Sequence, residues 1–117
     1  MVRKPTVLSK FNLREGKGEV EFHYILSKDE MMGHGPTYAR LVLKPGSSIG
    51  WHQHIGTMEP YYILSGTGAF IDDDGTTTVV GVDDVCYIEP NQSHSIENIS
   101  NKEDLVLMAL VLNDRNL

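Results

Sequence analysis

The sequence of 117 residues has little of what marks a membrane, secreted or helical protein. Its one cysteine, Cys86, cannot form a disulfide within the chain, so we expect a reducing, cytoplasmic location. No apolar run is long enough to cross a bilayer, and the first residues lack the apolar stretch of a secretory signal. Long helical periodicity is also missing. What remains is the composition of a small globular protein, with 40% hydrophobic and 22% charged residues.

Basic residues are also few, with 10 Lys and Arg against 16 Asp and Glu and a net charge of −6. General nucleic-acid binding needs a face rich in Lys and Arg that displaces counterions from phosphates, so this charge balance argues against it. An anionic small ligand stays possible, because a bound divalent cation would dominate the local field. The length suits one domain with a hydrophobic core, and we expect a single domain over residues 1–117.

Short β-branched and aromatic runs are separated by Gly, Pro and Asp about every 8–12 residues, which is typical of an all-β sandwich or barrel. Asp74-Gly75 predicts a tight hairpin turn. Ser27-Lys-Asp-Glu30 matches a capping box and predicts one short helical turn through Met32. The expected strands span residues 19–26, 38–44, 59–65, 69–72, 76–80, 84–88, 94–98 and 105–112.

Two of these expected strands are apolar on both sides. Residues 105–112 read Leu-Val-Leu-Met-Ala-Leu-Val-Leu, and residues 61–64 read Tyr-Tyr-Ile-Leu. A strand with no polar face must be covered on both sides. Cover by a second subunit predicts a homodimer, which is the commonest soluble assembly. The alternative is cover by the chain's own N-terminal segment.

Three side chains that can bind a metal stand together between Gly46 and Gly66. In an extended strand His52 and His54 point the same way, and a turn after them can fold Glu59 back onto the pair. His94, in a later expected strand, supplies a third imidazole. Imidazole nitrogens with one carboxylate suit Mn, Fe, Co, Ni, Cu or Zn rather than Ca or Mg. The pattern predicts one divalent transition metal per chain, with coordination positions open to water or a ligand.

The segment from Gly46 to Gly66 resembles the first cupin motif, G-x5-H-x-H-x4-E-x6-G, at every fixed position. The second motif, G-x5-P-x-G-x2-H-x3-N, is matched at His94 and Asn98, with Asp83 and Asn91 standing at its two glycines and Glu89 at its proline. Asn tolerates the left-handed conformation that a turn glycine supplies, so we expect the turn to be kept.

The resemblance implies an all-β, double-stranded β-helix (jelly-roll) barrel over residues 37–112, preceded by N-terminal strands at about residues 5–26. It also implies that His52, His54, Glu59 and His94 hold the metal inside the barrel. Among cupins the chain looks most like small bacterial oxalate decarboxylase-like proteins. That likeness rests on residues 45–50, His52-x-His54 and residues 61–66.

Three further residues are candidates for catalysis. Tyr61 shares a strand face with Glu59, Arg40 is able to clamp a substrate carboxylate, and His34 lies in a glycine-flanked loop that could close the barrel mouth. The plainer alternatives are packing for Tyr61, an exposed ion pair for Arg40 and an ordinary loop position for His34. His23 reads as a solvated histidine, and Cys86 as a core residue without an activating neighbour.

Two functions fit these residues. The first is a metalloenzyme of the decarboxylase, dioxygenase or isomerase type, acting on a small carboxylate or sugar-like substrate. The second is a non-enzymatic module that binds a metal or a small ligand, and it is favoured by the lack of a clear general acid or base beyond the expected ligands. A polar surrounding of Tyr61, Arg40 and His34 would favour the enzyme, and a dry apolar mouth would favour binding.

Overall fold

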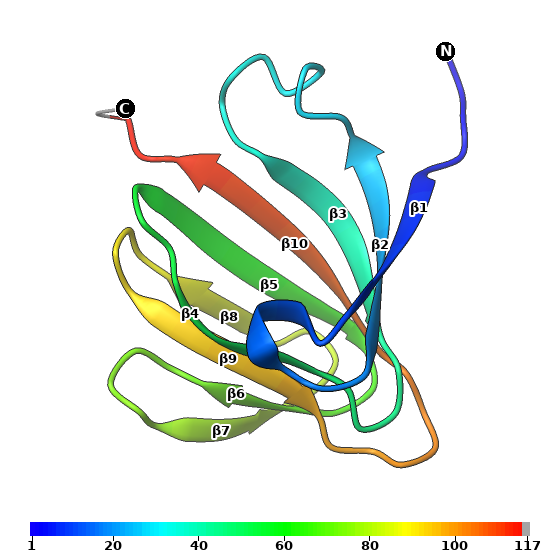
Figure 1. Cartoon of the computed structure of the whole chain (residues 1–117), viewed down its shortest axis with the longest axis vertical. Coiled ribbons are helices and arrows are strands. Elements are labelled where there is room, and N and C mark those ends of the chain that lie inside the picture. The colour runs from blue at the N-terminus through cyan, green and yellow to red at the C-terminus, as the bar shows by residue number, and fades with distance from the viewer. Residues whose placement is uncertain (116–117) are drawn as a thin grey trace.

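A computed structural model describes residues 1–115, which form ten strands and one 3₁₀ turn (Figure 1). The elements are β1 (Thr6–Phe11), η1 (Leu13–Glu15), β2 (Glu19–Leu26), β3 (Thr37–Leu43), β4 (Ser48–Gln53), β5 (Thr57–Ser65), β6 (Gly68–Ile71), β7 (Thr77–Val80), β8 (Val85–Ile88), β9 (Ser93–Asn98) and β10 (Leu105–Asn113). The eight expected strands are confirmed, with ends that differ by at most two residues. Within residues 1–115, no helix is long and apolar enough to span a membrane.

The strands form two antiparallel sheets that face each other as the layers of the barrel (Figure 1). The large sheet has six strands in the order β1-β2-β3-β10-β5-β8, and the small sheet has four in the order β4-β9-β6-β7. The chain changes sheet after β3, β4, β5, β7, β8 and β9, so neighbours in sequence often lie in opposite layers. This topology confirms the all-β, double-stranded β-helix class.

The core lies between the two sheets and follows from strict alternation along the strands. In β10, Leu105, Leu107, Ala109 and Val111 point inward and are buried, while the residues between them are only half-buried. Ile63 and Ile96 meet these side chains from β5 and β9 and are also buried. Burial of this apolar surface is the main favourable term for folding.

The part of the large sheet's outer face that is formed by β5, β8 and β10 is apolar and is not covered within residues 1–115. Tyr62 and Leu64 on β5 are 41% and 39% exposed, and Val85 and Tyr87 on β8 are 64% and 48% exposed. The N-terminal segment does not provide the cover considered from the sequence, because β1 pairs with β2 and extends the edge of the same sheet. That alternative is therefore wrong.

The segment after Ser27, expected to form a short helical turn, forms a turn that is not part of a helix. The capping box does form, since the backbone N–H of Ser27 donates to Glu30 Oε1 at 2.9 Å and that of Glu30 donates to Ser27 Oγ at 3.2 Å. Gly33-His34-Gly35-Pro36 then follows, and Gly and Pro do not continue a helix. The 3₁₀ turn instead lies at η1, where Asn12, Arg14 and Glu15 all have positive φ.

The hairpin at Asp74-Gly75 also differs in detail from a two-residue turn. Its loop is closed by hydrogen bonds from the N–H of Gly75 to Asp72 O and from the N–H of Asp72 to Thr76 O, each 2.9 Å long. Gly75 has a φ of +86°, which favours glycine, and Asp74 is not among the residues with positive φ. The hairpin between β6 and β7 is confirmed, with a longer loop than expected.

The second cupin-like motif keeps its turns without its glycines. Asp83 and Asn91, which stand at the two glycine positions, have φ angles of 73° and 71°. Asn98, the last residue of the motif, is buried and connects two chain segments. Its Nδ2 donates to the carbonyl oxygen of Leu43 at 2.9 Å and to that of Glu103 at 2.8 Å. Asp and Asn adopt the left-handed conformation more readily than other residues with a side chain, which explains why the turn survives.

Candidate metal centre

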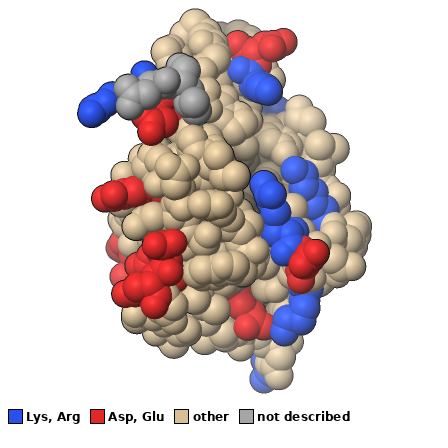
Figure 2. Space-filling view, turned by 60° about the vertical axis from the view of Figure 1, so that its left-hand side comes forward, with Lys and Arg blue, Asp and Glu red and all other residues tan. Residues whose placement is uncertain are grey.

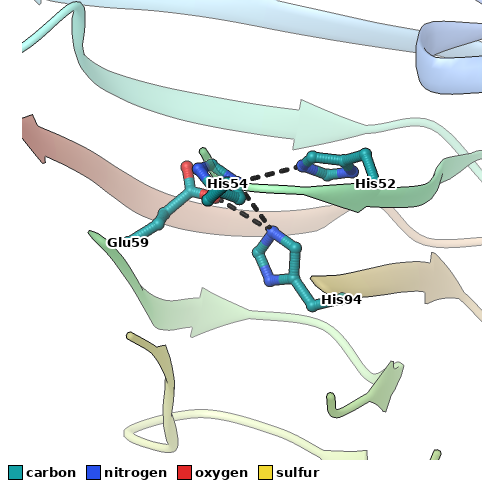
Figure 3. A group of neighbouring side chains, drawn as sticks. All are labelled: His52, His54, Glu59 and His94. Atoms are coloured by element: carbon teal, nitrogen blue, oxygen red, sulfur yellow. Dashed lines mark hydrogen bonds and ion pairs between the residues drawn. The ribbon is translucent and has the colours of Figure 1, made fainter. Parts of the chain in front are cut away.

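Four expected ligands come together from three strands and one turn (Figure 3). His52 on β4 lies directly opposite His94 on the neighbouring strand β9. His54 follows the last residue of β4, and Glu59 reaches the group from β5 in the other sheet. The turn between β4 and β5 brings the carboxylate back to the histidine pair, as the spacing predicts. The bounding residues Gly46 and Gly66 both have positive φ, at 72° and 89°, which favours glycine at each position.

The atoms of this cluster that can bind a metal face a common point. His54 Nε2 lies 3.1 Å from both His52 Nε2 and His94 Nε2. Glu59 Oε1 lies 3.1 Å from His54 Nε2 and 3.2 Å from His94 Nε2. Each of the four residues offers one such atom, and all four atoms lie within 4.8 Å of one another. The cluster therefore has the composition and convergence of a site that could hold a metal ion.

The second ring nitrogens of two histidines are held away from this point. His52 Nδ1 lies 2.7 Å from the carbonyl oxygen of Gly50, which can only accept, so this nitrogen carries the proton and Nε2 presents a lone pair. His54 Nδ1 lies 3.0 Å from Thr57 Oγ1. Contacts of this kind orient the histidines of metal sites and fix their tautomer.

His94 is oriented differently, since its Nδ1 is buried and has no hydrogen-bond partner among residues 1–115. Its ring is stacked on Tyr61 and meets Phe70 edge-on, with centroids 5.1 and 5.7 Å apart. Packing between aromatic residues therefore sets the direction of this imidazole.

Burial and neighbouring rings favour the protonation states that a metal needs. Burial lowers the pKa of His52 to about 4, with further lowering by His94 and His54, so the imidazole is neutral at pH 7. Burial alone would raise the pKa of Glu59, but hydrogen bonds to His54 and His94 outweigh it and leave the pKa below its ordinary value. Metal binding requires neutral imidazole and ionised carboxylate, and this pocket favours both.

The spacing of the donor atoms fits the binding of a single ion. Ligands about 2.1 Å from an ion lie about 3.0 Å apart at right angles and about 3.4 Å apart at the tetrahedral angle. The four separations around His54 Nε2 and Glu59 Oε1 are 3.1, 3.1, 3.1 and 3.2 Å and lie between these two values.

Three residues of the cluster, His52, His54 and Glu59, line a small cavity of about 140 Å³. Its walls are mixed: the apolar part is formed by Leu13, Phe22, Leu41, Ile49 and Val111, and Thr37 and Tyr61 add hydroxyl groups beside the cluster. Pockets for drug-sized ligands are about 300–1,000 Å³, so this cavity fits only a molecule of a few heavy atoms. Two cationic side chains, Lys10 and Arg14, also line it.

Tyr61 is the one catalytic candidate that reaches the cluster. It is buried and lines the cavity beside the carboxylate of Glu59. Burial and that carboxylate raise the pKa of Tyr61 well above its ordinary value. The hydroxyl is therefore protonated at pH 7 and acts as a hydrogen-bond donor.

Arg40 and His34 do not line this cavity. Arg40 lies on the outer face of the large sheet, where its Nη2 donates to His23 Nδ1 at 3.2 Å. His23 Nε2 in turn lies 3.0 Å from Glu21 Oε1, so His23 is not simply solvated as expected but is a half-buried link between Glu21 and Arg40. His34 is exposed in the loop before β3, and its carbonyl accepts from the N–H of Asn113 at 2.9 Å.

Sequence reasoning missed Arg14, Lys10 and Thr57. The two cations stand in the N-terminal segment, far in sequence from the histidines, and only the fold places them at the cavity. Thr57 sits in the turn that follows His54, and its hydroxyl could have been predicted as a partner from that spacing alone. Cys86 is buried as expected, and burial raises the pKa of its thiol to about 11.

Comparison with known proteins gives the class of this site. The chain is 46% identical over 101 residues to the oxalate-binding protein of Thermotoga maritima, covering 86% of this chain and 82% of the relative. A crystal structure of a predicted oxalate decarboxylase from Thermotoga maritima superposes with a TM-score of 0.88 at 43% identity, covering 97% and 98% of the two chains. A cupin-like protein from Thermotoga maritima shares the fold, with a TM-score of 0.73 at 18% identity over 99% and 82% of the chains.

The fold and the His/Glu cluster define a double-stranded β-helix protein with a possible metal site inside its barrel. The cupin domain family matches residues 39–111, which include all four residues of the cluster. The chain belongs to the cupin family.

Proposed function

We propose that this chain binds one divalent transition metal through His52, His54, Glu59 and His94 and uses the remaining coordination positions to bind a small carboxylate. The single observation that carries the proposal is the convergence of three Nε2 atoms and one carboxylate oxygen on a common point. A bound divalent ion would supply Lewis acidity and open positions for carboxylate oxygens. The mixed set of imidazole and carboxylate donors suits Mn, Fe, Co, Ni, Cu or Zn rather than Ca or Mg.

Oxalate is the first ligand to test. The relative that is 46% identical is named an oxalate-binding protein. The volume of about 140 Å³ is small and suits a compact ligand of oxalate's size.

Binding, rather than catalysis, is the function that the cavity supports best. A decarboxylase or isomerase needs a general acid or base beside the substrate, in addition to the ligands. Arg40 and His34 lie outside the cavity, and apart from the cluster itself its lining contains no carboxylate or histidine that could act as a base. The enzyme alternative rests on Tyr61, whose protonated hydroxyl next to Glu59 could donate a proton at the site.

We also propose that two chains pair through the outer face of the large sheet, the face formed by Tyr62, Leu64, Val85, Tyr87 and the outward residues of β10. These side chains form an apolar surface that the described chain leaves uncovered. Contiguous apolar surface of this kind is typical of interfaces between subunits. A second copy of the same face would cover it symmetrically.

The test of the binding proposal is calorimetric titration of oxalate into protein loaded with Mn, Co or Ni and into metal-free protein. We expect about one metal per chain after desalting and oxalate binding only in the loaded protein. The His52→Ala variant should bind neither. Metal-independent oxalate binding, or no retained metal with any of these ions, would contradict the proposal. Formation of carbon dioxide and formate from oxalate would establish the enzyme alternative instead.

A further inference from the structure

Arg14 stands at the entrance of the metal cavity. It lines the cavity of about 140 Å³ together with His52, His54 and Tyr61. It also lines an adjoining hollow of about 410 Å³ that is formed by Gln53 and the turn after β4. A ligand that passes from this hollow to the cluster moves past its guanidinium.

The backbone that carries Arg14 is held in an uncommon conformation. Arg14 itself has φ 55° and ψ 39°, and its neighbours Asn12 and Glu15 also have positive φ. Left-handed residues other than glycine persist only where the surrounding structure holds them, and they are often found at functional sites. The hydrophobic side chain of Leu13 anchors this turn against the core.

Two glycines, Gly16 and Gly50, allow the backbone of this turn to pack closely against β4. A Cβ atom on Gly50 would overlap the carbonyl oxygen of Arg14, and one on Gly16 would overlap the carbonyl oxygen of Ser48. The backbones of η1 and β4 therefore approach more closely than side chains would allow. The carbonyl of Gly50 is also the acceptor for His52 Nδ1, so one short segment positions both the arginine and a metal ligand.

The guanidinium of Arg14 has no carboxylate partner among residues 1–115. Other basic residues near the two sheets are paired, with Lys17 Nζ 2.9 Å from Glu97 Oε2 and Lys44 Nζ 3.4 Å from Glu21 Oε2. Lys10 lies over the Phe22 ring, 4.3 Å from its centroid, and also lines the cavity. On the face shown in Figure 2, Lys and Arg gather along one side while Asp and Glu gather along the other, despite the net charge of −6.

The charges within the cavity specify the class of ligand. The cluster contains one carboxylate and three imidazoles, so a bound divalent ion would retain one uncompensated positive charge. Arg14 and Lys10 add two more at the same cavity. This excess suits a ligand with two negative charges better than one with a single charge.

We propose that Arg14 is the residue that selects a dicarboxylate ligand. Its paired N–H groups donate to the carboxylate oxygens that do not bind the metal. Lys10 adds a second positive charge at the same cavity. This inference rests on the proposed function, because it assumes a metal at the cluster. Arginine suits the role, since its planar guanidinium binds a carboxylate with two parallel hydrogen bonds. The small cavity sets the ligand's length to that of oxalate or malonate.

Two ligands and three variants test this role. Oxalate and glycolate both chelate a metal, but glycolate lacks the second carboxylate. Arg14→Asn removes the guanidinium and keeps a residue that tolerates positive φ, and Arg14→Lys keeps the charge without the paired donors. Lys17→Ala is the matched control, because Lys17 pairs with Glu97 and does not line the cavity. Calorimetric affinities, metal content and the melting temperature of the metal-free protein are measured for each.

We expect Arg14→Asn to weaken oxalate binding at least tenfold and glycolate binding by no more than threefold, with unchanged metal content and melting temperature. Arg14→Lys should fall between, and Lys17→Ala should match the wild type. Equal oxalate affinity in the wild type and Arg14→Asn, or equal losses for both ligands, overturns the role of Arg14 and leaves the proposed function standing. Metal-loaded wild type that binds neither ligand overturns both.

Discussion

The ring of Tyr61 is stacked on the imidazole of His94, with centroids 5.1 Å apart and 16° between the planes. This contact orients a histidine whose Nδ1 has no hydrogen-bond partner among residues 1–115. The aromatic ring and the hydroxyl of Tyr61 therefore have separate roles. The ring positions His94, and the hydroxyl lies beside Glu59 at the cavity.

The first prediction separates these two roles with Tyr61→Phe. The variant keeps the stacked ring, so we expect metal content to stay near one per chain, while loss of a buried donor weakens oxalate binding by about 1 kcal/mol, or roughly fivefold. Calorimetry measures both quantities. Tyr62→Phe is the matched control, because its hydroxyl donates to Asp83 Oδ1 at 2.7 Å on the outer face of the large sheet. If Tyr61→Phe lost its metal as His52→Ala should, the hydroxyl would instead be needed to hold Glu59.

The cluster of three histidines and Glu59 could be predicted from the sequence because strand geometry is simple. Side chains two residues apart point the same way, and this placed His52 with His54 and Glu59 with Tyr61. The same parity put Arg40 on the opposite face from Ala39 and Leu41, and the structure confirms that it lies outside the barrel. Asp83 and Asn91 kept their left-handed turns, as the tolerance of Asn suggested for Asn91.

The entrance to the cavity could not be predicted in the same way. Arg14 lies in a turn formed by Asn12-Leu-Arg-Glu-Gly16, and no residue type in it demands positive φ at Arg14. That conformation is imposed by the close approach of Gly16 and Gly50, which are distant in sequence. At Ser27 the local signal was correct but did not decide the outcome. The hydrogen bonds of the capping box formed, but the chain after it could not continue a helix.

The second prediction concerns metal removal. Metal that binds only the folded state stabilises it by about 4 kcal/mol at a thousandfold excess over Kd, so chelation should lower the melting temperature of the loaded wild type by several degrees. His52→Ala should melt at nearly the same temperature with and without chelator, since the hydrophobic core is separate from the cluster. Differential scanning calorimetry compares the four samples. A wild type unaffected by chelator would argue against a bound metal.

The third prediction is the pH dependence of the metal-free protein. The pKa of His52 is about 4 in the folded state and about 6.5 when unfolded, so the unfolded chain binds more protons between these values. The free energy of unfolding should therefore fall as the pH drops from about 6.5 to 4. We expect a loss of about 1–2 kcal/mol from this group, after allowing for solvent screening of a partly exposed side chain. Urea unfolding at several pH values compares wild type with His52→Asn, whose curve should be flatter. Parallel curves would show that His52 does not titrate as described.

The fourth prediction tests the close packing of the η1 turn against β4 at Gly50. Gly50→Ala places a Cβ against the carbonyl of Arg14, and overpacking of this kind costs about 1–3 kcal/mol of the free energy of unfolding. Because the turn must shift, oxalate affinity should fall as well. Gly81→Ala is the control, since its Cβ would meet only the carbonyl of Gly66 at 3.9 Å. Denaturant unfolding measures both variants. A Gly50→Ala protein as stable as Gly81→Ala would show that η1 does not rest on β4 as closely as the structure indicates.

The fifth prediction concerns the outer face of the large sheet, where Leu64 is 39% exposed beside other apolar side chains. A charge placed in a self-complementary apolar interface is buried without a partner, which costs several kcal/mol, so Leu64→Glu should convert a dimer to a monomer at micromolar concentration. Val79→Glu is the matched control, because Val79 is 64% exposed on β7 in the small sheet and lies outside the proposed interface. Sedimentation equilibrium gives the molecular mass of each protein. Both variants should still bind metal, since neither residue lines the cavity, and this would show that they are folded. A monomeric wild type would contradict pairing through this face. A dimer that persists in Leu64→Glu and is lost in Val79→Glu would contradict it as well.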